Sequence, residues 1–165
     1  MGLLELLTFQ SLRRVAQLES DRVMLGDWSR VDVAHVAAFR RMTDVMTLHG
    51  IDTAGRPPVW AWRGTLRLRD AALLFDPEHE LSQGFATVTF TAPGDLVVLS
   101  DYAHWCQLLF DPVDAAIEAW QPERRHSRTC QPEQACLPYV RAEWVTRVRP
   151  LPRSGWNDLD QEQPV

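Results

Sequence analysis

Lysine does not occur anywhere in the 165-residue chain, so all 17 basic residues are arginines. This absence excludes mechanisms that need a lysine amine, among them Walker-type ATPases, protein kinases and Schiff-base or pyridoxal enzymes. Glycine is also sparse, and the eight glycines form no G-x-G-x-x-G phosphate loop. GC-rich codon usage replaces lysine by arginine throughout a genome, so the lack of lysine reflects the genome more than the chemistry of a functional site.

Cysteine is scarce and long apolar runs are missing. The three cysteines are an odd number in a chain large enough to fold without disulfides, which indicates reduced thiols in a bacterial-type cytosol. No stretch approaches the roughly 20 apolar residues of a membrane span, and the N-terminus lacks the basic start of a secretory signal. The sequence therefore predicts a soluble, cytoplasmic protein.

Acidic residues outnumber basic residues, and the net charge is −5. Nucleic-acid affinity comes mainly from neutralised phosphates, so a general nucleic-acid binder is not expected. No metal is expected either. His126, Cys130 and Cys136, even together with Cys106 or His104, form neither a C-x-x-C nor an H-x-x-x-H pair.

The length predicts one domain, since domains average about 150 residues. We expect a single α+β domain over residues 1–151, with a mixed or mostly antiparallel sheet flanked by three or four helices. Residues 3–9 are apolar and predict a strand, and Ser11 is placed to cap the helix that follows. Apolar residues at helical spacing predict another helix within residues 32–49.

The second half of the chain alternates between strand and turn signals. Residues 85–91 alternate apolar and polar side chains and, with the apolar run 96–99, predict a hairpin. Residues 136–151 predict one or two terminal strands. The polar stretch 121–134 is typical of a surface loop, and residues 152–165 predict a frayed, flexible tail.

Residues 57–70, PPVWAWRGTLRLRD, alternate with period two and predict extended backbone at least through Arg63. If the alternation continues, tryptophans and leucines share one face, and Arg63, Arg67 and Arg69 share the other. One interpretation is a half-buried strand with a solvated arginine face. The other is an anion-binding row of arginines beside two indoles.

Ser100 precedes apolar residues at helical spacing and is interpreted as a helix N-cap, with Asp101 interacting favourably with the helix dipole. Ser100 with His104, or Cys106 with His104, could form a nucleophilic pair, but neither pair lies in a diagnostic motif. Asp111, followed by a proline, predicts the start of a further helix.

A series of short strings extends over nearly the whole chain. They are LTFQ (7–10), FRRM (39–42), PPVWAW (57–62), LR (68–69), VVLSDYAHW (97–105), EQA (133–135) and EWVTRVRPL (143–151). In this order they resemble a bacterial family, the domain of unknown function numbered 3841, which has no settled activity. The chain departs from the family pattern at Leu7, Arg41, Cys106 and either Phe110 or Asp111, where the family usually has Trp, an aromatic residue, His and Asn.

The resemblance implies that certain polar and aromatic residues converge on one ligand-binding site. They are Thr8, Gln10, Trp60, Trp62, Arg69, Ser100, Asp101, Trp105 and Gln134. The polar residues of the opening strand and Glu133 of a late strand are also placed similarly to the NAD-contacting strands of ADP-ribosyltransferases. This similarity makes NAD or another nucleotide a candidate cofactor. In that superfamily a catalytic glutamate follows two residues later, where this chain has Ala135, and Glu143 is the carboxylate close by.

Two functions are consistent with these residues. The first is a domain that binds or acts on a nucleotide-like or other anionic small molecule, because indoles offer stacking surfaces and arginines bind phosphate or carboxylate. The second is a non-catalytic interaction or regulatory module, because tryptophan and arginine are also enriched at protein interfaces.

Overall fold

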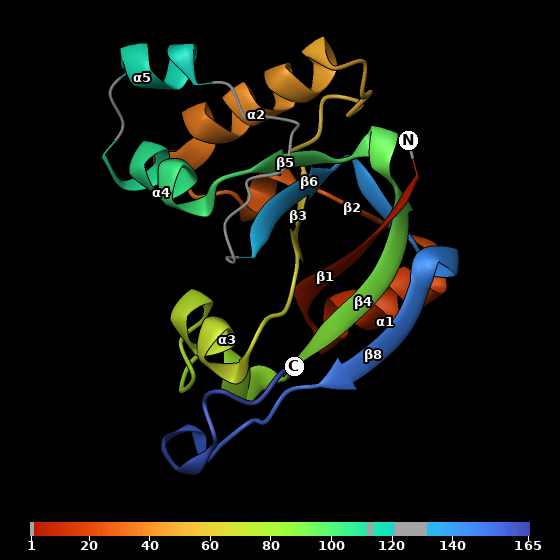
Figure 1. Cartoon of the computed structure of the whole chain (residues 1–165), viewed down its shortest axis with the longest axis vertical. Helices are drawn as coiled ribbons and strands as arrows, with labels where there is room; N and C mark the ends of the chain where they lie inside the picture. The colour runs from red at the N-terminus through yellow and green to blue at the C-terminus, as the bar shows by residue number, and fades with distance from the viewer. Residues whose placement is uncertain (1, 112–113, 121–131) are drawn as a thin grey trace.

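The computed structural model describes residues 2–111, 114–120 and 132–165, which form a single α+β domain with a mostly antiparallel sheet (Figure 1). The strands are β1 (Leu3–Ser11), β2 (Val23–Leu25), β3 (Val59–Arg63), β4 (Phe85–Pro93), β5 (Val98–Ser100), β6 (Glu133–Leu137), β7 (Tyr139–Arg141) and β8 (Val145–Pro150). The α-helices are α1 (Leu12–Asp21), α2 (Val36–Leu48), α3 (Leu68–Leu74), α4 (Tyr102–Phe110) and α5 (Asp114–Ala119). The described ranges thus contain one helix more than the upper number predicted.

The main sheet has the strand order β5-β6-β3-β1-β4-β8, and its neighbouring strands pair antiparallel. β1 pairs with β4 along its whole length but meets β3 at one register position, Leu7↔Trp62. The sheet therefore has two halves, β5-β6-β3 and β1-β4-β8, which are joined at the centre by little backbone pairing. β2 and β7 form a separate two-stranded sheet.

β1 can occupy the centre of the sheet because both of its faces are apolar. Leu6 packs in one hydrophobic cluster with residues of β3, β4 and β6, whereas Leu7 and Phe9 pack in another with α3. Ser11 ends the strand, and its hydroxyl accepts a 3.3 Å hydrogen bond from the Arg14 N–H at the start of α1. The predicted opening strand and the Ser11 cap are both confirmed.

Replacing Ser11 with alanine should destabilise the protein by about 1 kcal/mol, because the Arg14 N–H loses its capping acceptor. Urea unfolding followed by circular dichroism measures this loss. Ser20 is exposed near the other end of α1, and among the described residues its hydroxyl bonds only to the adjacent Asp21, so Ser20→Ala is the control. Equal stability of Ser11→Ala and Ser20→Ala would show that the cap contributes nothing.

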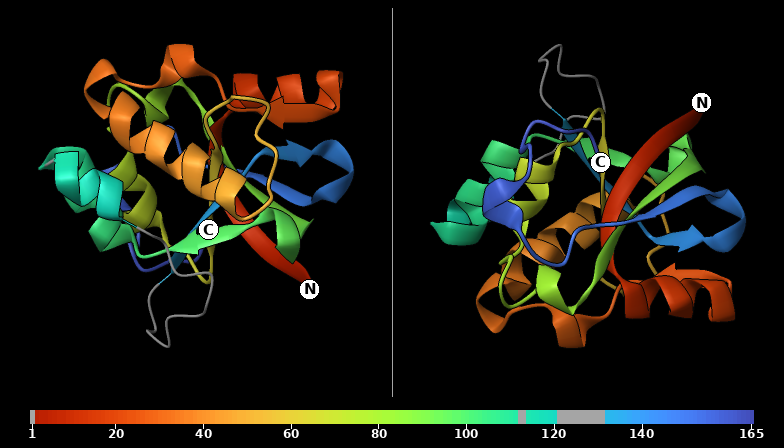
Figure 2. Two further views of the ribbon diagram at one scale, coloured as in Figure 1. Left: turned by 90° about the horizontal axis from the view of Figure 1, so that it is seen from above. Right: turned by 90° about the horizontal axis from the view of Figure 1, so that it is seen from below.

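Helices cover the sheet unevenly. α2, α4 and α5 gather near β5 and β6, and α1 lies on the side of the molecule away from α4 and α5 (Figure 1, Figure 2). The helix predicted within residues 32–49 is confirmed as α2, preceded by a 3₁₀ turn at Val33–His35. Met42 and Met46 of α2 are fully buried and pack in one cluster with Trp105 of α4.

The hairpin predicted from residues 85–91 and 96–99 is wrong. β4 pairs with β1 and β8, whereas β5 pairs with β6 at the opposite edge of the sheet. A 3₁₀ turn at Gly94–Leu96 separates the two strands. Alternation identifies a strand but not its partner, because the partner is selected by residues far away in the sequence.

The N-cap of α4 is Asp101, not Ser100 as predicted. The Asp101 carboxylate accepts a 2.9 Å hydrogen bond from the His104 N–H. Ser100 is instead the last, buried residue of β5. The helix start predicted at Asp111 adjoins residues 112–113, which lie outside the described residues.

The predicted row of three arginines does not form, because β3 ends at Arg63 and α3 soon follows. The Arg67 N–H donates a 2.7 Å hydrogen bond to the Asp70 carboxylate, which caps the first turn of α3. Leu68 and Ala71, three residues apart, are both buried in the cluster that contains β1. The apolar residues in this short segment fit either the periodicity of a strand or that of a helix, and packing on β1 selects the helix.

The C-terminal segment also differs from the predicted frayed tail, because residues 152–165 fold back along α3 (Figure 1). Trp156 is 7% exposed and packs with residues of α3 and β1. The N–H groups of the first two residues of α3 donate to the carbonyls of Gln163 and Gln161. A helix start leaves such donors unpaired, so a polar segment can be ordered by supplying their acceptors.

The predicted loop 121–134 is wrong at its end, since Glu133 and Gln134 belong to β6. Residues 121–131 lie outside the described residues. The terminal strands predicted within residues 136–151 are confirmed as β7 and β8. In the described part of the chain, every helix is too short or too polar to cross a membrane.

Candidate functional site

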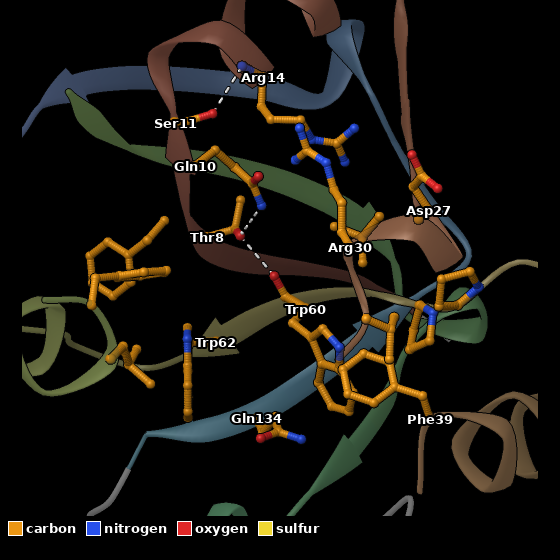
Figure 3. A pocket seen from close by; sticks show the side chains of 18 of the residues that line it. Thr8, Gln10, Ser11, Arg14, Asp27, Arg30, Phe39, Trp60, Trp62 and Gln134 are labelled. Atoms are coloured by element: carbon orange, nitrogen blue, oxygen red, sulfur yellow. Dashed lines mark hydrogen bonds between the residues drawn. The ribbon is translucent and has the colours of Figure 1, made fainter. Parts of the chain in front are cut away.

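A cleft of about 670 Å³ lies where the two halves of the sheet meet (Figure 3). β1, the start of α1, residues 26–31 and β3 contribute most of its lining. α2, α3, α4 and β6 contribute one or two residues each. Segments that range from residue 8 to residue 134 therefore form this one concavity.

Aromatic rings form one side of the cleft. Trp60 is packed against Phe39, with ring centroids 5.4 Å apart, and against Trp105, at 4.6 Å. Trp62 contacts Tyr102 edge-to-face at 4.9 Å. Trp60 is thus enclosed by two rings, whereas Trp62 stands apart from Phe39 in Figure 3 and packs on the cluster that contains residues of α3. Burial and a hydrogen bond with Cys106 raise the pKa of Tyr102, so its hydroxyl stays protonated.

A chain of hydrogen bonds joins the two halves of the sheet inside the cleft. The Gln10 amide donates to the Thr8 hydroxyl over 2.9 Å, and this hydroxyl donates to the Trp60 carbonyl over 2.7 Å (Figure 3). On β6, the buried Gln134 amide donates to the Ser100 hydroxyl over 3.3 Å. The Trp60 indole N–H is buried and has no acceptor among the described residues. The Thr8 hydroxyl thus links β1 to β3, as backbone hydrogen bonds would in a continuous sheet.

Two guanidinium groups, from Arg14 and Arg30, lie together at another side of the cleft (Figure 3). Arg14 donates to the Leu25 carbonyl over 2.8 Å, and its Nε is buried with no hydrogen-bond acceptor in the described ranges. Partial burial lowers the pKa of Arg14, and the charge of Arg30 lowers it further, whereas Asp27 acts in the opposite direction. The two arginines therefore repel each other, and Asp27 offsets this repulsion in part.

Asp27 lines the same side of the cleft and is exposed. Its carboxylate accepts a 2.9 Å hydrogen bond from the Ser29 N–H and so caps the 3₁₀ turn Trp28–Arg30. Hydrogen bonding to Ser29, with smaller contributions from Arg30 and Arg14, lowers the pKa of this carboxyl group below its usual value. Asp27 is therefore ionised at neutral pH.

The cleft brings together most, but not all, of the residues singled out from the sequence. Those that line it are Thr8, Gln10, Trp60, Trp62, Trp105 and Gln134. Ser100 pairs with Gln134 across β5 and β6, and Asp101 caps α4 next to Tyr102. Arg69 does not line the cleft, because it lies on α3 and forms an ion pair with Glu162 of the C-terminal segment.

Sequence reasoning missed the arginines that do line the cleft. Arg14 follows Ser11 by three residues, so its position beside the cleft follows from the strand–helix junction of β1 and α1. Arg30 is placed by the turn that Asp27 caps. Asp followed by a short polar turn is a recognisable capping signal and could have identified the turn, but not its proximity to Arg14.

The nucleophilic pairs considered from the sequence gain no support from the contacts. The Ser100 hydroxyl is engaged by Gln134, and the His104 backbone is engaged by Asp101. Cys106 is hydrogen-bonded to Tyr102. Among the described residues no group of three or more metal-ligating side chains occurs, and His126 and Cys130 lie outside them.

The carboxylates considered for ADP-ribosyl transfer are not among the residues that line the cleft. Glu133 forms an ion pair with Arg63 at 3.4 Å, and Glu143 forms one with Arg141 on the surface at 3.3 Å. Comparison of the chain with protein-family models, curated proteins and solved structures finds no match. The function of the chain must therefore be inferred from the chemistry of the site itself.

Proposed function

We propose that the cleft binds a nucleotide-like small molecule, with its anionic group at Arg14 and Arg30 and its flat ring on Trp62. The volume of about 670 Å³ fits within the range of roughly 300–1,000 Å³ that is usual for small-molecule sites. NAD is one candidate of this class. We propose ligand binding only, because the contacts in the cleft assign no reaction.

The observation that carries the proposal is the pair of guanidinium groups. Neither Arg14 nor Arg30 forms an ion pair with a carboxylate among the described residues, although like charges so placed repel. An anion between them would relieve this repulsion and accept hydrogen bonds, and arginine binds phosphate and carboxylate well. The aromatic rings across the cleft offer a flat surface on which a planar base can stack.

The second candidate function is a protein-interaction module, favoured by one surface feature. Tyr139 and Trp144 stack at 5.5 Å, and the Arg141 guanidinium lies over both rings. The adjacent edge strand β8 exposes Arg147 and Arg149. Aromatic and arginine side chains in such an arrangement are typical of interface hot spots.

Titration with adenosine monophosphate, ATP, NAD and glucose phosphate, followed by calorimetry and tryptophan fluorescence, tests the first function. We expect saturable binding, and Arg30→Gln should weaken it about tenfold or more by removing a charged hydrogen-bond donor. Arg69→Gln is the matched control, because Arg69 lies outside the cleft. No binding of any of these ligands, together with concentration-dependent self-association, would favour the interaction module.

A further inference from the structure

The carboxylates that line the cleft are found at two separate places in the described chain. Glu80 lies beside Phe75, which follows α3, and its carboxylate accepts a 2.7 Å hydrogen bond from the Asp76 N–H. Asp27 lies on the side of Arg14 and Arg30 (Figure 3). Asp27 therefore lies on the same side of the cleft as the two arginines that would bind a ligand anion.

Asp27 lies close to Arg14 and Arg30, but its carboxylate is hydrogen-bonded elsewhere. Its hydrogen bond is to the Ser29 N–H, and no ion pair joins it to Arg14 or Arg30 in the described chain. The same bond caps the turn that presents Arg30. The local structure thus fixes one negative charge beside two positive charges and leaves both guanidinium groups without an ion-pair partner in the described chain.

We propose that Asp27 is a specificity-determining residue that disfavours doubly charged phosphate monoesters relative to singly charged groups such as phosphate diesters. This inference rests on the proposed function of the cleft. Two arginines and one aspartate leave a formal local charge of +1 (2 − 1). A terminal phosphate monoester carries about −1.5 to −2 at pH 7, whereas a diester carries one negative charge. Because Coulomb repulsion scales with the product of the charges, Asp27 repels a bound monoester more strongly than a bound diester.

The chain offers a matched pair of substitutions that separates this charge effect from capping. Asparagine caps a turn about as well as aspartate, so Asp27→Asn should keep the Ser29 bond and remove the charge. Asp32 caps the next 3₁₀ turn in the same way, through a 2.9 Å bond from the Ala34 N–H, and does not line the cleft. Asp32→Asn is therefore the control.

The probes are adenosine monophosphate and its methyl ester, which share a base and differ in phosphate charge. At low ionic strength the charge of Asp27 should lower the affinity for the monophosphate more than the affinity for the ester. Asp27→Asn should shift the affinity ratio toward the monophosphate by about threefold to fivefold, the effect of one exposed charge. Asp32→Asn should leave the ratio unchanged, and added salt should reduce the shift.

The outcomes separate this inference from the proposed function. If wild-type protein binds both probes and Asp27→Asn leaves their ratio unchanged, the selective role of Asp27 is overturned while the cleft remains a nucleotide site. If Asp32→Asn shifts the ratio equally, the effect is one of overall charge, and the inference is again overturned. If neither probe, nor any ligand of the wider panel, binds the wild type, the proposed function itself is wrong.

Discussion

Replacing Trp105 with alanine should destabilise the protein by about 3–5 kcal/mol, the usual loss for a buried aromatic residue. Trp105 is 3% exposed and contacts Phe39, Trp60 and Trp120 at centroid distances of 5.6, 4.6 and 5.4 Å. Its removal therefore leaves a cavity in the cluster that joins α2, α4 and β6. Guanidinium unfolding followed by circular dichroism measures the loss.

The control for this experiment is Trp144→Ala, which removes the same side chain from a partly exposed stack with Tyr139. It should cost clearly less than Trp105→Ala. A change near zero for Trp105→Ala would contradict the core role and would mark the ring as an exposed binding residue. Because Trp105 also supports Trp60, ligand affinity should fall with Trp105→Ala as well.

Substituting alanine for Gly26 should destabilise the protein by about 3 kcal/mol, at the upper end of what overpacking costs. A Cβ atom built at Gly26 would lie 1.8 Å from the Pro57 carbonyl oxygen and 2.7 Å from its carbon. The obstacle is backbone on both sides, so no side-chain rotation relieves it. Gly26 and Pro57 must therefore move apart, and both line the cleft.

Gly2→Ala is the control, because a Cβ atom there meets no atom within 4 Å. Thermal unfolding should show a lower Tm for Gly26→Ala and no change for Gly2→Ala. Ligand affinity measured on folded Gly26→Ala should also fall, since residues 26–31 carry Arg30 and Asp27. A wild-type Tm for Gly26→Ala would mean that the approach to Pro57 is looser than described.

Local features of the fold were predictable because neighbouring residues determine them. β1, the Ser11 cap and α1 follow from an apolar run, a capping hydroxyl and helical spacing, and all are observed. α2 follows from one apolar face. The class of fold, α+β with a mostly antiparallel sheet, is confirmed for the same reason, since it depends on the kinds of element present.

Features that depend on distant partners were not predictable. β4 and β5 are neighbours in sequence, yet they lie in opposite halves of the sheet, because β1 and β6 compete successfully as partners. Residues 152–165 are polar and still pack, because they supply acceptors for the start of α3 and bury Trp156. Neither effect is visible in a window of a few residues.

The candidate site shows the same division. The tryptophans of β3, Thr8, Gln10 and Gln134 were found from sequence and do share one cleft. Arg69 was expected beside them as part of an alternating strand, but the strand ends at Arg63 and the arginine pairs with Glu162 instead. That expectation assumed that the strand periodicity continues to Arg69, but the strand ends at Arg63 and a helix begins at Leu68.

By itself, the amino-acid sequence determined that no lysine is present in these 165 residues, where β1, α1 and α2 form, and which indoles and amides are available for a site. The tertiary structure alone decided that Arg14 and Arg30, with Asp27, are the charges beside those indoles. The physical reason is that a residue's type and spacing set its local conformation, whereas its distance from another charge depends on how separate segments pack around a shared core.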